Sequence, residues 1–144
     1  MNAARIRSEP VITQTPMEEV RGWCSVAARA ASAKKGEDTV ILVVGPVLAI
    51  TDAFVITAGD NPRQVRTIAE EVERQVKLSG GPAPRRIEGL DDARWVLMDF
   101  GDFVVHVLLG EARAFYDLER LWNDTERWSW EDGGERVEAL AAGQ

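Results

Sequence analysis

The 144-residue chain has one cysteine, Cys24, and one histidine, His106. A single cysteine excludes an intramolecular disulfide, and one thiol with one imidazole is too few for a thiolate and imidazole zinc site. The longest apolar runs, at residues 39–50 and 103–109, fall short of the roughly 20 residues that a membrane-spanning helix requires. No continuous apolar segment leads to a cleavage site near the N-terminus, so we expect no secretory signal and a cytoplasmic location.

Basic residues are outnumbered, because 17 lysines and arginines face 24 acidic residues and leave a net charge of −7. Residues 123–144 hold much of this excess. An acidic chain without a basic patch is poorly suited to neutralising phosphates, so we expect neither sequence-specific nucleic-acid binding nor a membrane partner. A basic protein partner suits this charge, although negative charge can also serve only to keep a small domain soluble.

The hydrophobic content of 45% is enough for one core, and the patterns predict alternating helices and strands. A first helix is predicted to begin with Thr15 as N-cap, Pro16 at its first position and Glu18 closing a capping box, and to end at residues 34–36. Residues 39–44 and 53–58 are β-branched and apolar, which is typical of buried strands.

A second helix is predicted from Asn61 as N-cap, Pro62 next to it and Gln64 three residues after the cap, and Gly80 ends it. A phosphate-binding loop at this helix start is the alternative, but Asp60 would repel an anion there. The predicted buried face of this helix is Val65, Ile68, Ala69, Val72 and Val76.

Residues 85–89 are predicted to form a short strand. A hairpin follows with its turn at Gly101-Asp102, where a glycine in the first central position suits a two-residue type II′ turn. This turn pairs Leu97 with His106 and Asp99 with Val104. One face of the hairpin is then wholly apolar and is predicted to join the core: Val96, Met98, Phe100, Phe103, Val105 and Val107. The other, here called the mixed face, contains Trp95, Leu97, Asp99, Val104, His106 and Leu108.

The mixed face has the composition of a protein-binding patch, with aromatic, aliphatic, acidic and imidazole groups side by side. Asp99 and His106 are diagonal neighbours there and are placed to hydrogen-bond. No nucleophile or further ligand in the stretch converges on them, so we predict neither a catalytic nor a metal site. The alternative is that a helix covers this face and His106 is a hydrogen-bonded core residue.

A final helix is predicted over residues 111–122, with Phe115, Leu118 and Trp122 in the core. Tyr116 and Glu119 lie at its side and extend the mixed face. We therefore predict a mobile extension at residues 1–16, a single domain at 17–122 and an acidic tail at 123–144. The tail is expected to be only partly ordered, and its two tryptophans either dock or remain mobile.

Three segments, "TDAFVITAGDNPRQVRTIAEEVE", "RRIEGLDDARWVLMDFGDFVVHV" and "RAFYDLERLW", together resemble the ribosomal silencing factor family, also called Iojap or RsfS, in their order and spacing. The resemblance covers about residues 20–122. It implies one α/β domain with a mixed β-sheet of about five strands flanked by helices, an architecture like that of nucleotidyltransferases. It implies no known catalysis and no cofactor.

The resemblance also implies a function. Members of the family bind the large ribosomal subunit through large-subunit ribosomal protein fourteen, a basic protein, and block joining of the small subunit, which represses translation when nutrients are short. The family pattern falls on Trp95, Asp99 and His106 of the hairpin and on Phe115 and Tyr116. Together with the mixed face, this gives the predicted partner-binding residues: Trp95, Leu97, Asp99, His106, Leu108, Tyr116 and Glu119.

Two other functions remain open from the residues. A nucleotidyltransferase-like enzyme needs paired carboxylates to hold Mg²⁺ against a triphosphate, but Asp99 has no carboxylate two residues away, and Asp60 and Asp102 lie in a loop and a turn. A homodimeric adaptor without a ribosomal role would bury the mixed face against a second copy of the chain.

Overall fold

The computed structural model describes residues 15–131, which form one mixed six-stranded sheet with helices on both faces. The strand order is β3-β4-β5-β2-β1-β6, in which β2 and β5 pair in parallel and the other neighbours are antiparallel. The elements are α1 (Met17–Ala33), β1 (Glu37–Val43), β2 (Ala53–Gly59), α2 (Pro62–Leu78), β3 (Arg86–Glu88), β4 (Trp95–Asp99), β5 (Phe103–Leu109), α3 (Gly110–Tyr116), the 3-10 helix η2 (Leu118–Trp122) and β6 (Arg127–Trp128).

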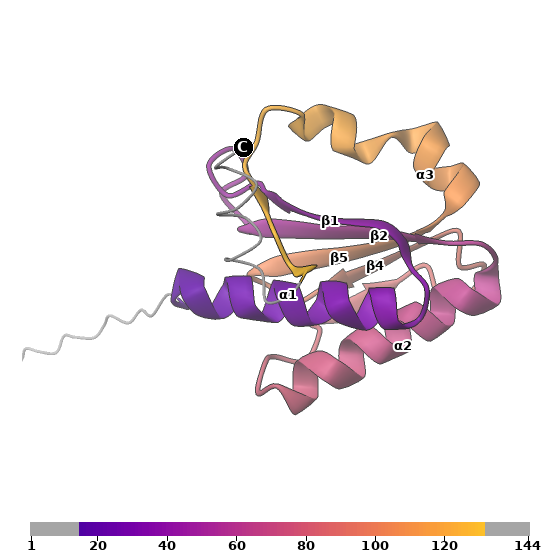
Figure 1. Cartoon of the computed structure of the whole chain (residues 1–144), viewed down its shortest axis with the longest axis horizontal. Helices are drawn as coiled ribbons and strands as arrows, with labels where there is room; N and C mark the ends of the chain where they lie inside the picture. Colours follow the sequence, from indigo (N-terminus) through magenta and orange to yellow (C-terminus); the bar gives the residue numbers. More distant parts are fainter. Residues whose placement is uncertain (1–14, 132–144) are drawn as a thin grey trace, which may run out of the picture.

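The helices divide into two layers, with α1 and α2 on one face of the sheet and α3 and η2 on the other (Figure 1). The buried face of α2 consists of the five apolar residues predicted for it, and the core face of the hairpin is buried as predicted. The core therefore lies mainly between the sheet and the α1–α2 layer. Among residues 15–131 no helix has the length and apolar character needed to cross a membrane.

The predicted cap of α1 is wrong, whereas that of α2 is confirmed. The N-cap of α1 is Pro16, not Thr15, and no side chain caps this helix start. The Pro16 carbonyl accepts the first turn's bonds from the N–H groups of Glu19 and Val20, so the helix begins one residue later than predicted. At α2 the Asn61 side chain accepts a 2.9 Å hydrogen bond from the backbone N–H of Gln64.

The hairpin of β4 and β5 has the predicted register. Leu97 lies opposite His106 and Asp99 opposite Val104, and the Phe100 N–H donates a 2.9 Å bond to the Phe103 carbonyl across the turn. Gly101 has a φ of 91°, a left-handed value that explains the glycine at this position. Because side chains alternate along a strand, this register fixes which residues share the mixed face.

The single helix predicted over residues 111–122 is wrong, because the chain breaks at Asp117. This residue has a φ of 48°, and its N–H closes the last turn of α3 on the Arg113 carbonyl. The break rotates the segment that follows, so η2 buries Trp122 while Phe115 of α3 is left 78% exposed. Phe115 is therefore not the core residue that an unbroken helical period predicts.

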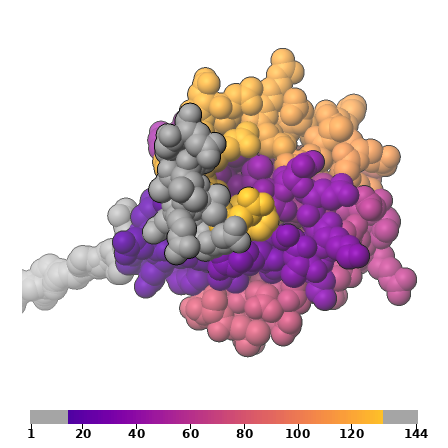
Figure 2. Space-filling model, viewed as in Figure 1, coloured from indigo at the N-terminus to yellow at the C-terminus, as the bar shows by residue number. Residues whose placement is uncertain are grey.

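The sheet has six strands rather than about five, because the segment after η2 adds β6 to the edge of β1. Trp128 lies opposite Ile41 and is buried, and the guanidinium of Arg21 lies 5.4 Å from the centre of its ring. Trp130 donates from Nε1 to the Thr39 carbonyl at 3.0 Å. Figure 2 shows the yellow atoms of this segment between α1 and the orange helices. Both tryptophans are docked, and the predictions for residues 1–14 and 132–144 lie outside the described residues.

Candidate functional site

The mixed face lies on the side of the sheet opposite α1 and α2, and it has an accessible and a buried part. Trp95, Leu97 and Asp99 of β4 are half-buried, as is Val104 of β5. The predicted partner-binding residues His106 and Leu108 are both buried, and Leu108 is fully so. The strand parity is as predicted, but these two side chains lie beneath the surface rather than on it.

His106 belongs to an aromatic cluster at the centre of this face. The Phe54 ring meets the imidazole edge-on with 4.7 Å between ring centres, and Trp122 of η2 packs against the other side of the cluster, 5.7 Å from Phe54. The Trp95 Nε1–H donates a 3.0 Å hydrogen bond to His106 Nδ1. The histidine therefore pairs with Trp95 rather than with Asp99, and the alternative of a buried core histidine describes its surroundings better.

Burial also sets the charge of the imidazole. Desolvation lowers the pKa of His106 to about 4, so the ring is neutral near pH 7. Because Nδ1 accepts the bond from Trp95, the proton of the neutral ring is on Nε2. Nε2 has no hydrogen-bond partner within the described part of the chain. His106 thus supplies one buried N–H donor and no positive charge.

Asp99 holds the end of the hairpin. Its Oδ1 accepts a 2.8 Å bond from the Gly101 N–H, and its Oδ2 lies 3.9 Å from Nε of Arg86 on β3. Arg86 lies directly opposite Asp99 in the β3–β4 register and also pairs with Glu88 at 3.2 Å. The carboxylate therefore stabilises the turn, and its side chain is 23% exposed beside Arg86 at the edge of the mixed face.

Glu119 is engaged within the protein. Its Oε2 accepts bonds of 2.7 and 3.0 Å from the guanidinium of Arg113, which also donates to the carbonyls of Glu37 and Asp38. Burial alone would raise the pKa of Glu119. The hydrogen bond from Arg113, together with weaker favourable interactions, has a larger opposite effect, so the pKa of Glu119 lies below its usual value. This ion pair ties η2 to α3 and to the start of β1. Residue spacing does not predict this pair, because its two partners belong to different elements.

An aromatic strip extends the accessible part of the mixed face. Tyr116 is 51% exposed and its ring lies 4.9 Å from that of Trp95, while Phe115 meets Tyr116 edge-on at 5.0 Å. Leu121 on η2 is also exposed. The family resemblance includes Phe115, but the helical period assigned it to the core, and Leu121 was not predicted at all, because an unbroken helix would have oriented both side chains differently. We call Trp95, Leu97, Phe115 and Tyr116 the aromatic strip.

A cavity of about 310 Å³ opens beside the strip, over the turn end of the sheet. Its walls come from β2, β3, β4 and β5, from the turn at Gly101 and from the segments preceding β2 and β3. They include Phe54, which was missed although the parallel register places it directly opposite Val104. The lining residues are Leu48, Ile50, Thr51, Phe54, Arg85, Arg86, Leu97, Asp99, Gly101, Val104 and His106.

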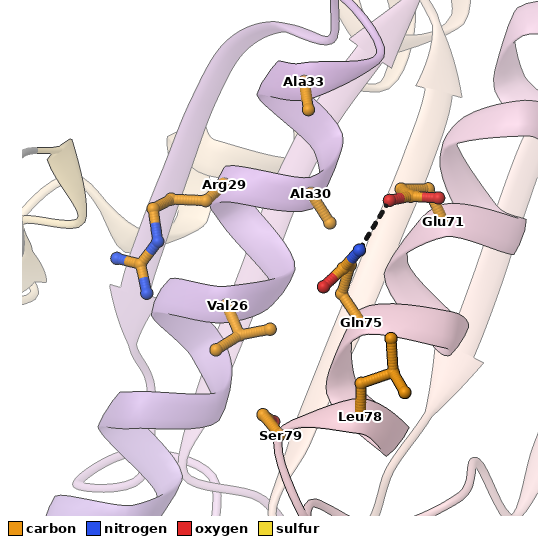
Figure 3. A pocket seen from close by; sticks show the side chains of 8 residues that line it. All are labelled: Val26, Arg29, Ala30, Ala33, Glu71, Gln75, Leu78 and Ser79. Atoms are coloured by element: carbon orange, nitrogen blue, oxygen red, sulfur yellow. Dashed lines mark hydrogen bonds between the residues drawn. The ribbon is translucent and has the colours of Figure 1, made fainter.

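A second hollow, of about 340 Å³, lies between α1 and α2, away from the mixed face (Figure 3). Val26 and Ala30 line it from α1, and Leu78 lines it from α2. Gln75 donates a 2.8 Å bond to Glu71 across its wall, and hydrogen bonds from Arg74 and Gln75 lower the pKa of Glu71. The remaining polar side chains of the hollow donate to backbone carbonyls, Arg29 to Trp130 at 3.2 Å and Ser79 to Val76 at 2.8 Å, so the polar groups of this hollow already have partners.

The other titratable groups do not converge into a metal site. Among residues 15–131, no three or more histidine, cysteine, aspartate or glutamate side chains are grouped so that they could hold a metal ion. Asp52 and Asp102 are neighbours, since the Asp52 N–H donates to the Asp102 carbonyl at 2.8 Å, and burial followed by repulsion from Asp102 raises the pKa of Asp52. Burial also raises the pKa of Cys24, which makes this thiol unreactive.

Comparisons with known proteins identify the fold and the family. A crystal structure of a protein from Chromobacterium violaceum superposes with a TM-score of 0.69 at 32% identity, over 74% of this chain and 88% of that one. The ribosomal silencing factor RsfS of Bacillus subtilis is 40% identical over 99 residues, which are 69% of this chain and 83% of that protein. A mouse protein named for mitochondrial assembly of the ribosomal large subunit is 33% identical over 92 residues, 62% of this chain and 40% of its own length. The family model described as "Ribosomal silencing factor during starvation" matches residues 17–143, so the chain belongs to the RsfS family.

Proposed function

We propose that this protein represses translation by binding the large ribosomal subunit through large-subunit ribosomal protein fourteen, where it blocks joining of the small subunit. Family membership supports a ribosomal role, as do the names of the relatives from Bacillus subtilis and mouse. The structural observation that carries the proposal is the aromatic strip, which leaves large apolar side chains exposed on the sheet face that α1 and α2 do not cover.

The aromatic strip has the properties of a binding hot spot. Large aromatic side chains dominate the binding energy of many protein interfaces. The Trp95 ring is already fixed by its bond to His106 and its contact with Tyr116, so it loses little side-chain entropy on binding. Phe115 and Tyr116 project further into solvent and would reach the partner first.

Charge favours a basic partner such as ribosomal protein fourteen. The net charge of −7 attracts a basic surface over a distance and accelerates encounter. Near the aromatic strip, Glu111 and Asp117 are exposed, and Asp99 is half-exposed. These carboxylates can form the polar rim around an apolar centre.

The buried candidates support this surface from beneath. His106 orients Trp95, Leu108 packs in the interior, and the pair of Glu119 with Arg113 holds η2 in place. In this proposal they act on the partner only through the residues they position. The mechanism is steric occupation of a ribosomal surface, so it requires no catalytic step, cofactor or metal.

The test is co-sedimentation of purified variants with large ribosomal subunits. Trp95→Ala and Phe115→Ala should each weaken binding by about 2 kcal/mol, roughly 30-fold, if they are hot spots. Leu78→Ala is the matched control, because Leu78 is a similarly exposed apolar side chain on α2, behind the sheet. It should bind like the unmodified protein.

Circular dichroism must first show that each variant is folded. Equal binding by folded Phe115→Ala and Trp95→Ala would contradict the proposed surface. If the protein binds large subunits but does not inhibit their association with small subunits, the steric mechanism is contradicted. The homodimeric adaptor would be supported by a different pair of results. No form of the protein would bind large subunits, and the variants of the aromatic strip would lose the ability to dimerise.

A further inference from the structure

The cavity beside the aromatic strip combines an apolar floor with polar groups that lack partners. Phe54, Leu97 and Val104 contribute its apolar walls. Its volume of about 310 Å³ is at the lower end of the range of roughly 300 to 1,000 Å³ typical of small-molecule pockets. A few polar groups in such a setting usually orient a ligand.

Two of these polar groups are buried donors. His106 is only 4% exposed and Thr51 only 7%, and both line the cavity. Within residues 15–131 neither His106 Nε2 nor Thr51 Oγ1 has a hydrogen-bond partner. The bond from Trp95 to Nδ1 directs the opposite edge of the imidazole, which carries Nε2–H, away from Trp95. A buried donor without an acceptor costs free energy, so both groups favour a ligand that brings an acceptor oxygen.

Two guanidinium groups stand at the rim. Arg86 is partly neutralised by Glu88 at 3.2 Å and by Asp99 at 3.9 Å. The Arg85 guanidinium lies over the turn at Gly101, close enough that a side chain on that glycine would meet it at 3.1 Å. Because Glu88 and Asp99 already pair with Arg86, Arg85 is the rim cation that faces a ligand, and this favours a single negative charge.

We propose that this cavity binds a small carboxylate with an aromatic or branched aliphatic body. The body lies on Phe54, Leu97 and Val104, and the carboxylate accepts hydrogen bonds from His106 Nε2 and Thr51 Oγ1 while facing Arg85. A monoanion suits the site better than a phosphate dianion, since Asp99 would repel the second charge.

The position of the cavity gives the ligand a regulatory effect, and this part rests on the proposed function. Leu97 belongs both to the cavity wall and to the aromatic strip, and His106 both lines the cavity and orients Trp95. A bound carboxylate therefore changes the surface that would meet the ribosome. In this proposal a ligand seated on Leu97 competes with the partner for that side chain, so it weakens subunit binding. Because coupling between two ligands is reciprocal, large subunits weaken carboxylate binding by the same factor.

The direct test follows the imidazole nitrogens by NMR during titration with benzoate and with indole-3-carboxylate. The chain has a single histidine, so the imidazole signals need no assignment. Saturable shifts at Nε2 with a Kd of about 1 mM or below are expected. The neutral isostere benzamide should bind at least tenfold more weakly. Linear shifts without saturation, or equal binding of benzoate and benzamide, would overturn the site.

Variants locate the binding. Thr51→Val keeps the shape of the side chain and removes its hydroxyl, and Arg85→Gln removes a rim charge, so each should weaken benzoate at least fivefold. Arg63→Gln, on the exposed start of α2, controls for the loss of a guanidinium and should leave the Kd unchanged. Equal affinity of Thr51→Val, Arg85→Gln and Arg63→Gln would place the carboxylate elsewhere and refute the proposal.

A separate experiment tests regulation. Co-sedimentation with large subunits is repeated with benzoate at about three times its Kd, and binding should fall about threefold in the unmodified protein but much less in Thr51→Val. Carboxylate binding without any effect on co-sedimentation would refute the coupling and leave the site intact. Absence of co-sedimentation in every condition, together with a saturable benzoate shift, would contradict the proposed function alone.

Discussion

The indole Nε1 of Trp95 donates a 3.0 Å hydrogen bond to Nδ1 of His106, which links an accessible residue of β4 to a buried residue of β5. Because these strands are neighbours in the sheet, the bond joins the surface of the mixed face to its interior. One contact thus fixes both the orientation of the indole and the tautomer of the imidazole.

Trp95→Phe keeps an aromatic ring and removes the donor. We expect a loss of about 1 kcal/mol in the free energy of unfolding, measured by urea denaturation, because a part-buried acceptor loses its partner. The imidazole nitrogen shifts should also show that Nδ1 gains a share of the proton. Trp23→Phe, on α1, is the control and should leave the imidazole spectrum unchanged. An unaltered spectrum in Trp95→Phe would show that the bond does not set the tautomer.

His106 should make stability depend on pH. Its pKa is lowered from 6.5 to about 4 by burial, so between these values the unfolded chain binds more protons than the folded one. The contribution of the neutral imidazole to the free energy of unfolding is therefore fully present above pH 6.5. Below that pH it falls by about 1.4 kcal/mol per pH unit, so the loss reaches roughly 3 kcal/mol near pH 4. Urea denaturation from pH 7.5 to 4 measures this loss. His106→Gln, which cannot gain the charge, should show a flatter profile, and parallel profiles would refute the assignment.

The pair of Glu119 with Arg113 should contribute to stability because both side chains are largely buried. Glu119→Gln should cost about 1 to 2 kcal/mol at pH 7, since it weakens a charge-assisted hydrogen bond. The pKa of Glu119 is lowered, so this contribution is present above pH 4.5 and is lost as the pH falls through the folded-state value. The control is Glu111→Gln, because Glu111 pairs with Arg94 at 3.3 Å but is 75% exposed, and it should change stability by less than about 0.5 kcal/mol. Equal effects of the two variants would show that burial does not strengthen the first pair.

Trp128→Ala tests whether the segment after η2 is part of the folded domain. Its indole is 5% exposed, and removing a buried tryptophan typically costs about 3 to 5 kcal/mol. Trp130→Ala should cost less, because that side chain is only partly buried and its main contact is the bond to Thr39. Thermal unfolding of both variants provides the measurement. A negligible effect of Trp128→Ala would mean that β6 adds little to the sheet.

Sequence patterns predicted the elements whose geometry depends on nearby residues. The Gly101-Asp102 turn fixes the register of the hairpin, and strand alternation then assigns every residue of β4 and β5 to a face. The helix α2 was predicted equally well, because its cap at Asn61 and its apolar period are both local.

The errors arose where distant residues decide the outcome. Aspartate is one of the few residues besides glycine that adopt a left-handed conformation, but this weak preference does not predict one at Asp117. The conformation accompanies two contacts between separate elements, the ion pair of Arg113 with Glu119 and the burial of Trp122. The partner of His106 depended on whether Trp95 or Asp99 turns toward it, and parity alone leaves both on the same face. The addition of β6 depended on a contact between Trp128 and Ile41, far apart in the chain.

The pairing of Trp128 with Ile41 also bears on how the chain folds during its own synthesis. The edge of β1 that pairs with β6 is synthesised well before residues 127–128, which cover part of that edge in the folded domain. Until then β1 presents an unpaired strand edge, the kind of surface that joins readily to strands of other chains. Pairing of residues 127–128 with β1 therefore protects this strand edge, and the nascent domain can associate with other chains through the edge until those residues have been synthesised.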